Sequence, residues 1–249
     1  MATLIAPYGG GLVDLFVGPD EIKDLKAEAA ILPSIQISER SVCDLEMLAT
    51  GAFSPLNRFM GKEDYHSVLE DMRLSSGHIY PIPVTLCVNS SPEIQLDHRI
   101  ALRNAKNELL AVMVLEEIYE WDRREVAEKV FRTQDVRHPV VSEMHRWGKL
   151  QVSGQIQVLK LPRRYDFQEL RLTPSETRKK LSKLTHNNVV AFQTRNPLHR
   201  VHEELTKKAI QEHDAALLLH PVIGMTKPGD VDYYTRVRTY KILASRYYD

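Results

Sequence analysis

Two short apolar runs in the last third of the chain constrain its fold most. They read Val-Val-Ala-Phe at 189–192 and Ala-Leu-Leu-Leu at 216–219, and neither alternates with polar residues. Continuous apolar runs are typical of strands that are buried on both faces. A helical pattern follows each run, at 197–212 and 232–248. The pattern therefore predicts parallel strands at 188–192 and 215–222, covered by helices, with a ligand site at their carboxyl ends.

The first two thirds of the chain have a different organisation, with short β-like runs separated by turn residues. The expected strands cover 12–17, 79–88, 100–103, 109–119 and 155–161, and the expected helices cover 44–50, 63–72 and 123–131. The polar residues at 104–107 predict a hairpin connection.

A change of composition marks the expected domain boundary. Pro162 and the charged residues after it interrupt the strand pattern. We therefore predict a β-rich domain over residues 1–165 and the first part of an α/β domain over residues 166–249. Inside the second domain, Thr173, Pro174 and Glu176 have the positions of an N-cap, a first-turn proline and the acidic residue of a capping box, which predicts a helix over 173–184.

Charge and length narrow the class of protein. The chain of 249 residues has 33 basic and 33 acidic side chains, so its formal net charge is zero. Without an overall field to attract nucleic acid or acidic membranes, any anion site must be local. The isolated thiols of Cys43 and Cys87 are interpreted as small buried hydrophobes in a reducing compartment. No apolar run approaches the roughly 20 residues of a membrane helix, and no signal-peptide pattern opens the chain, so we expect a cytoplasmic protein.

The segment after the first apolar run gathers groups that bind anions. Asn196 is a favoured N-cap residue and Pro197 suits the first position of a helix, so a helix is expected to begin here. The unpaired N–H groups of such a helix start form an anion site. Arg195 adds a planar fork of donors to a tetrahedral oxyanion, and Gln193 and Thr194 add neutral hydrogen bonds.

Two histidines follow on the same helix. His199 and His202 are three residues apart, hence on one face near the helix start. We expect an apolar stripe beside them to seat the helix on the sheet, formed by Leu198, Val201, Leu205 and Ala209. Two histidines at this spacing are also compatible with metal ligation, but no nearby Cys or third His completes a zinc spacing, so no metal site is predicted. Each feature is common by itself, and their combination within ten residues is what indicates a site.

The combined motif is similar to a known signature. Residues 193–202 read Gln-Thr-Arg-Asn-Pro-Leu-His-Arg-Val-His, which resembles the sulfurylase version of the HxxH signature of nucleotidyltransferases. The Gln-Thr-Arg-Asn part is specific to the sulfate adenylyltransferase (ATP sulfurylase) family. Further blocks similar to this family lie at 44–60, 80–83, 133–139, 166–174 and 220–230. The chain departs from the family at Tyr8, where histidine is common. Family members also continue past the counterpart of position 249, through a Gly-Arg-Asp-His loop that completes the ATP site.

The resemblance implies a fold and a reaction. The expected fold is a PUA-like barrel followed by a truncated Rossmann-like nucleotidyltransferase domain. The expected reaction transfers adenylyl from ATP, accompanied by Mg²⁺, to sulfate and releases pyrophosphate, in an enzyme that assembles as a homo-oligomer. The implied catalytic residues are Thr194, Arg195, Asn196, His199 and His202. The implied substrate-binding residues are Gln193, Arg195, Asn196, His199, His202, Lys227 and Asp230.

The sequence leaves three other interpretations open. Another adenylyltransferase of the superfamily would lack the Gln-Thr-Arg-Asn part and the long N-terminal domain. A nucleic-acid-binding module would carry a basic stripe with interleaved aromatic residues. A non-catalytic fragment that binds only anions fits the two predicted strands, since a sheet covered on both faces normally has more. We therefore expect the chain alone to bind sulfate or phosphate weakly, to make no adenosine phosphosulfate, and to be less stable in its C-terminal part.

Overall fold

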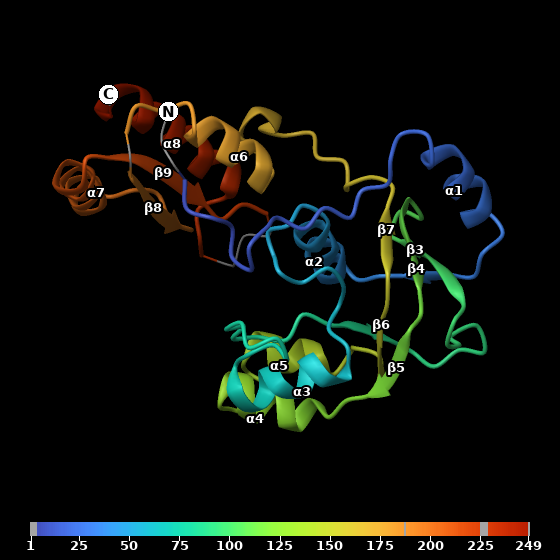
Figure 1. Ribbon diagram of the computed structural model, residues 1–249. Coiled ribbons are helices and arrows are strands. Elements are labelled where there is room, and N and C mark those ends of the chain that lie inside the picture. The colour runs from blue at the N-terminus through green and yellow to red at the C-terminus, as the bar shows by residue number, and fades with distance from the viewer. Residues whose placement is uncertain (1–3, 187, 225–228, 249) are drawn as a thin grey trace. The chain divides into compact units, whose positions relative to one another are not determined.

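The computed structural model describes residues 4–186, 188–224 and 229–248. The chain forms two compact units. One comprises Ala6–Ser175, and the other comprises Glu176–Asp249 together with Met1–Ile5. Figure 1 shows the helices and strands of each unit.

The N-terminal unit contains two sheets and five α-helices within its described residues. The larger sheet has the order β1-β3-β4-β7, with bounds Ser34–Gln36, Arg99–Arg103, Leu109–Val114 and Ile156–Val158. The smaller sheet has the order β2-β6-β5, with bounds Leu86–Val88, Leu150–Ser153 and Glu117–Glu120. The helices are α1 (Ile22–Ala29), α2 (Glu39–Ala49), α3 (Lys62–Asp71), α4 (Arg123–Phe131) and α5 (Pro139–Met144). A short 3₁₀ helix, Gln168–Leu170, follows β7. In the described residues these strands form two separate sheets and no closed barrel, which corrects the expected barrel.

Several predicted elements of this unit are confirmed. The helix at 123–131 and the strand at 100–103 are present, and β3 and β4 form the predicted antiparallel hairpin. In its turn, the side-chain oxygen of Asn104 accepts hydrogen bonds from the backbone N–H groups of Lys106 and Glu108, at 3.0 and 2.9 Å. An Asn side chain that bonds to the backbone two residues on is the reason such residues favour turns.

Three predicted strands need correction. The stretch at 12–17 forms only an isolated bridge between Phe16 and Val158, in which Val158 bonds to the backbone of Leu15 and Val17. The stretch at 79–88 is a strand only over its last three residues, since two prolines at 81 and 83 lack the donors of a ladder. The stretch at 109–119 divides into β4 and β5, which lie in different sheets. Strands β1 and β6 were not predicted.

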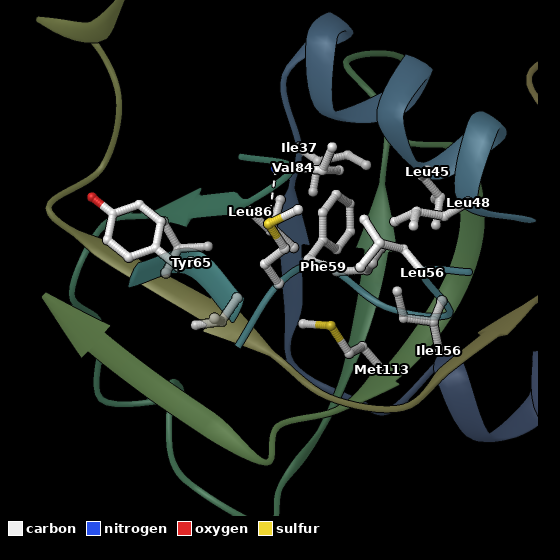
Figure 2. Close-up of a cluster of buried hydrophobic side chains, with 14 of the residues drawn as sticks. Ile37, Leu45, Leu48, Leu56, Phe59, Tyr65, Val84, Leu86, Met113 and Ile156 are labelled. Carbon is white, nitrogen blue, oxygen red and sulfur yellow. Dashed lines mark hydrogen bonds between the residues drawn. The ribbon is translucent and has the colours of Figure 1, made fainter. Parts of the chain in front are cut away.

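A hydrophobic core joins the two sheets and the helices of this unit. Phe59 and Leu48 are fully buried, and Met113 of β4 is 1% exposed. Figure 2 shows Phe59 in the middle of this cluster, with Leu45 and Leu48 of α2 beside it. Burying a side chain of this size stabilises the fold by about 1.5–3 kcal/mol. Cys43 was expected in the core, but it is exposed on α2, since the buried positions of that helix are taken by Ser41, Val42, Leu45, Leu48 and Ala49.

The C-terminal unit contains a parallel β-α-β element. Helix α6 (Pro174–Leu181) precedes β8 (Asn188–Thr194), α7 (Arg200–His213), β9 (Ala215–Pro221) and α8 (Tyr233–Tyr247). β8 and β9 pair in parallel over their whole length, from Asn188 with Ala215 to Thr194 with Pro221. The predicted parallel pairing is therefore confirmed, as is the helix start at Pro174.

The prediction that both faces of this sheet are buried is wrong for the described structure. No position of β8 is fully buried: Val189, which is 37% exposed, Ala191 and Gln193 are exposed, and the positions between them are half-buried. Helix α7 packs against both strands and covers one face. Because the described sheet has only two strands, the residues of the alternate face have little to pack against.

Candidate anion-binding site

The predicted motif forms a turn at the carboxyl end of β8. Thr194 is the last residue of the strand, and its hydroxyl accepts a hydrogen bond from the backbone N–H of Asn196 at 3.1 Å. The same hydroxyl lies 3.0 Å from the carbonyl oxygen of Asn196, to which it donates. A threonine hydroxyl that bonds two residues ahead is a common way to fold a tight turn. The side chains of Gln193, Arg195 and Asn196 remain exposed to solvent, where an anion can reach them.

Helix α8 holds this turn from its other side. Arg236 is 3% exposed, and its guanidinium donates hydrogen bonds to the carbonyl oxygen of Arg195 and to that of Val222, the latter at 3.2 Å. One helical turn later, the Tyr240 hydroxyl donates to the carbonyl oxygen of Asn196 at 2.6 Å. Burial raises the pKa of Tyr240, which keeps its hydroxyl protonated and able to donate.

The start of α7 differs from the prediction. The helix begins at Arg200 rather than at Pro197, and its N-cap is His199 rather than Asn196. Nδ1 of His202 accepts a hydrogen bond from the backbone N–H of His199 at 3.2 Å, in the manner of a capping box. The carbonyl of an N-cap residue accepts the first intrahelical hydrogen bond, whereas that of Asn196 accepts from the hydroxyls of Thr194 and Tyr240.

The face of α7 that packs on the sheet also differs from the prediction. Val201 and Leu205, expected in the buried stripe, are 74% and 56% exposed. The buried position is Thr206, whose hydroxyl lies 2.6 Å from the hydroxyl of Tyr248. The His202 ring is half-buried and its centroid lies 5.6 Å from that of Phe192 on β8. His202 and Thr206, four residues apart, therefore determine which side of the helix faces the strands.

The two histidines thus occupy different environments. The His199 side chain is exposed, and its ring meets that of His202 edge to face at 5.5 Å between centroids. His202 lies in the packed face of α7, which corrects the expectation that both histidines flank that face. The structure nevertheless keeps both rings within one turn of the helix start, next to the turn that carries Arg195.

The loop after β9 carries the remaining predicted residues. Lys227 lies outside the described residues. Asp230 is half-buried in the connection to α8, next to Gly229, whose φ of 87° suits glycine. His220 of β9 is exposed and paired in register with Gln193, so both side chains stand on one face of the sheet near its carboxyl end.

Arg236 and Tyr240 were not among the site residues predicted from the sequence. Their spacing of four residues within a helical pattern was available as a signal. It did not distinguish Arg236 from Arg238, because a helical pattern with apolar residues on several sides does not show which arginine faces inward.

Other features involve none of the residues of this site. A cavity of about 480 Å³ lies within the N-terminal unit, where the Arg40 guanidinium stands 4.8 Å over the Trp147 ring, and it contains none of the predicted site residues. At the family-variant position, the Tyr8 hydroxyl donates to the carbonyl oxygen of Ile79 at 3.2 Å. Among the residues described, no group of three or more His, Cys, Asp or Glu could hold a metal ion. Over the same residues, every helix is too short or too polar to cross a bilayer.

The arrangement defines a class of protein: a β-rich unit followed by a parallel β-α-β element, with an exposed turn that carries Arg195 and Asn196 at the carboxyl end of β8. Comparison with known families agrees with this class. Residues 5–161 match the PUA-like domain family and residues 168–249 match the ATP-sulfurylase family. The chain belongs to the PUA-like domain family, whose model matches more than half of it, and its remaining part is similar to the ATP-sulfurylase family.

Individual relatives support the same assignment. A sulfate adenylyltransferase of Mycosarcoma maydis is 44% identical and aligns with 97% of this chain and 43% of its own length. One of Schizosaccharomyces pombe is 44% identical over 90% of this chain and 47% of its own. A solved structure described as a hexameric APS kinase from Thiobacillus denitrificans matches with a TM-score of 0.78, 31% identity, and coverage of 98% of this chain and 44% of that one. The chain thus spans less than half the length of these proteins.

Proposed function

We propose that this chain supplies the sulfate-binding part of a sulfate adenylyltransferase, which joins sulfate to the adenylyl group of ATP and releases pyrophosphate. The observation that carries the proposal is the turn after β8, where Arg195 and Asn196 are exposed while their carbonyl groups are bonded to α8. Arginine matches a tetrahedral oxyanion with two parallel donors. Sulfate is a poor nucleophile, so positioning and charge stabilisation must supply most of the rate enhancement.

Within this proposal each predicted site residue has a role. Arg195 holds sulfate, and Gln193 and Asn196 contact sulfate or the phosphates of ATP, with Thr194 shaping the turn through its two hydrogen bonds to Asn196. His199 and His202, at the start of α7, stabilise the charge that develops around the α- and β-phosphates. Lys227 and Asp230, on the loop after β9, are proposed as further contacts to the substrates.

The nucleotide is proposed to enter as its Mg²⁺ complex. Mg²⁺ bound to ATP is held largely by phosphate oxygens and water, so the lack of a three-residue metal cluster in the described part of the chain is compatible with this substrate. No step of the chemistry is assigned to a metal held by protein side chains.

The wider organisation is proposed on the same grounds. Residues 166–249 would open a Rossmann-like nucleotidyltransferase domain, with the boundary to the PUA-like domain at 165, since β8, α7 and β9 form one parallel β-α-β unit. A homo-oligomer is proposed because the matched solved structure is described as hexameric. A cytoplasmic location agrees with the two free thiols, Cys43 and Cys87.

Two measurements test the proposal. Molybdate imitates sulfate but yields an unstable product, so molybdate-dependent ATP cleavage reports the site directly. We expect turnover from a chain of the relatives' full length. From the present chain we expect only weak sulfate binding, because the two-stranded sheet of β8 and β9 supplies few side chains to enclose a nucleotide. In the long chain, Arg195→Ala should lower turnover on the order of a hundredfold. The exposed Arg246 of α8 supplies the matched control Arg246→Ala. An Arg195→Ala variant within threefold of the parent would refute the assignment.

A further inference from the structure

We propose that Arg236 and Tyr240 are positioning residues that make the turn after β8 selective for anions. The inference rests on the proposed sulfate site, and it assigns a function to side chains of α8 that touch no substrate. Both project from one face of α8, four residues apart, and both are buried.

Side chains of α8 bind the carbonyl groups of the turn after β8. An oxyanion is attracted by N–H groups and repelled by carbonyl oxygens, so an anion site must turn its carbonyls away. Three carbonyls lie around this turn, those of Arg195, Asn196 and Val222. Each accepts a hydrogen bond from α8: Arg236 donates to the first and third, and Tyr240 donates to the second. The oxygens are therefore held on the α8 side of the turn.

Arg236 places a buried positive charge at this turn. Arg236 is 3% exposed, and its Nε is buried without a hydrogen-bond partner. In the part of the chain that the structure describes, no carboxylate forms an ion pair with Arg236, and its guanidinium bonds to carbonyl oxygens. A buried cation with no counter-ion is costly by itself and lowers the free energy of an anion bound nearby. Its positive charge lies directly beneath the turn that carries Arg195.

Arg236 also bonds to the carboxyl ends of both β8 and β9. The backbone N–H of Val222, just after β9, donates to the carbonyl oxygen of Thr194 at 2.8 Å. Because Arg236 bonds to residues that follow β8 and β9, it joins the two strand ends whose loops carry the predicted substrate contacts. A change at Arg236 should therefore alter both loops, whereas a change at Tyr240 should alter the Asn196 side alone.

The test uses the present chain and inorganic sulfate as the probe. Five variants are compared with the parent: Tyr240→Phe, Arg236→Met, Arg236→Lys, Arg195→Ala and the control Arg238→Met, which removes an exposed charge from the same helix. Amide hydrogen exchange of Asn196 and Val222 reports the turn without any ligand, and sulfate titration followed by amide chemical shifts reports the site. Thermal unfolding of each variant shows whether it is folded.

We expect Tyr240→Phe to speed the exchange of Asn196 by about tenfold, which corresponds to one lost hydrogen bond. Arg236→Met should speed both amides and weaken sulfate binding by at least about tenfold, through the lost charge and the freed carbonyls. Arg236→Lys retains the charge and should recover most of the sulfate affinity. Arg238→Met should stay within about twofold of the parent, because an exposed charge is screened.

The outcomes separate the two proposals. Parent-like amide exchange and parent-like sulfate affinity in folded Tyr240→Phe and Arg236→Met would overturn the positioning role. If Arg236→Met does not fold, Tyr240→Phe and Arg236→Lys decide the question. If the turn responds to these variants but the parent chain binds no sulfate that depends on Arg195, the positioning of the turn stands and the proposed function falls.

Discussion

The backbone N–H of His199 donates to Nδ1 of His202 across 3.2 Å, and the His202 ring lies against Phe192 while that of His199 is exposed. The two histidines of the motif therefore differ in what they contribute to the fold. His202 caps the helix and packs on the sheet, whereas His199 contributes only its backbone to the cap.

This difference predicts different costs of substitution. His202→Ala removes the acceptor of a helix cap and a ring contact, so it should lower the free energy of unfolding by roughly 1–2 kcal/mol. His199→Ala should lie within about 0.5 kcal/mol of the parent. Urea unfolding of the two variants, with exposed His213→Ala as the control, measures both. Equal losses for His199→Ala and His202→Ala would contradict the observed packing.

The orientation of α7 makes a second prediction. Leu205 is 56% exposed and Thr206 is 2% exposed, so Leu205→Ser should change the free energy of unfolding by no more than about 0.5 kcal/mol. Thr206→Val keeps the shape but leaves the Tyr248 hydroxyl without its 2.6 Å partner, at a cost of about 1–2 kcal/mol. A larger loss for Leu205→Ser than for Thr206→Val would contradict the observed orientation and would show that the predicted apolar stripe is the packed face of α7.

Close backbone packing at Gly154, between β6 and β7, makes a third prediction. A Cβ on Gly154 would stand 1.7 Å from the carbonyl oxygen of Val114, whereas a Cβ on Gly11 meets nothing within 4 Å. Gly154→Ala therefore requires the backbone to move, and we expect a loss of about 3 kcal/mol or more in the free energy of unfolding. Gly11→Ala should be neutral. Thermal unfolding measures both variants. Equal melting temperatures for Gly154→Ala and Gly11→Ala would show that the backbone around Val114 moves away without cost.

The half-buried carboxyl of Asp44 makes the fourth prediction, a dependence of stability on pH. Burial raises the pKa of Asp44 from 3.8 to about 6, although Arg40 acts in the opposite direction and Glu143 adds to the rise. Because the folded state favours the protonated form, this contribution to stability is present below pH 3.8 and is lost as the pH rises through 6.

Asp44→Asn removes this loss. The variant should match the parent near pH 4 and exceed its free energy of unfolding at pH 7 by on the order of 1–3 kcal/mol. Guanidinium unfolding across this range measures the difference, and exposed Asp20→Asn provides the control. A parent and a variant whose stabilities run parallel from pH 4 to pH 7 would show that Asp44 is ionised in the fold without cost.

Local patterns in the sequence were sufficient for some of the elements. Continuous apolar runs identified β8 and β9 and their parallel pairing, and the Asn104 turn identified the hairpin of β3 and β4. These features depend on residues close together in the chain, whose propensities and hydrogen bonds act locally. The ten-residue motif was found in the same way, because its residues are consecutive in the chain and cover the end of β8, the turn after it and the start of α7.

Tertiary structure alone decided how those elements are used. The helix start moved from Pro197 to Arg200 because Tyr240, far along the chain, bonds the carbonyl of Asn196. The packed face of α7 was determined by contacts of His202 and Thr206 with Phe192 and Tyr248 rather than by its apolar stripe. Arg236 became the buried arginine of α8 because the carbonyls of Arg195 and Val222 lie where its guanidinium reaches. Such partners are set by long-range packing, which no local periodicity encodes.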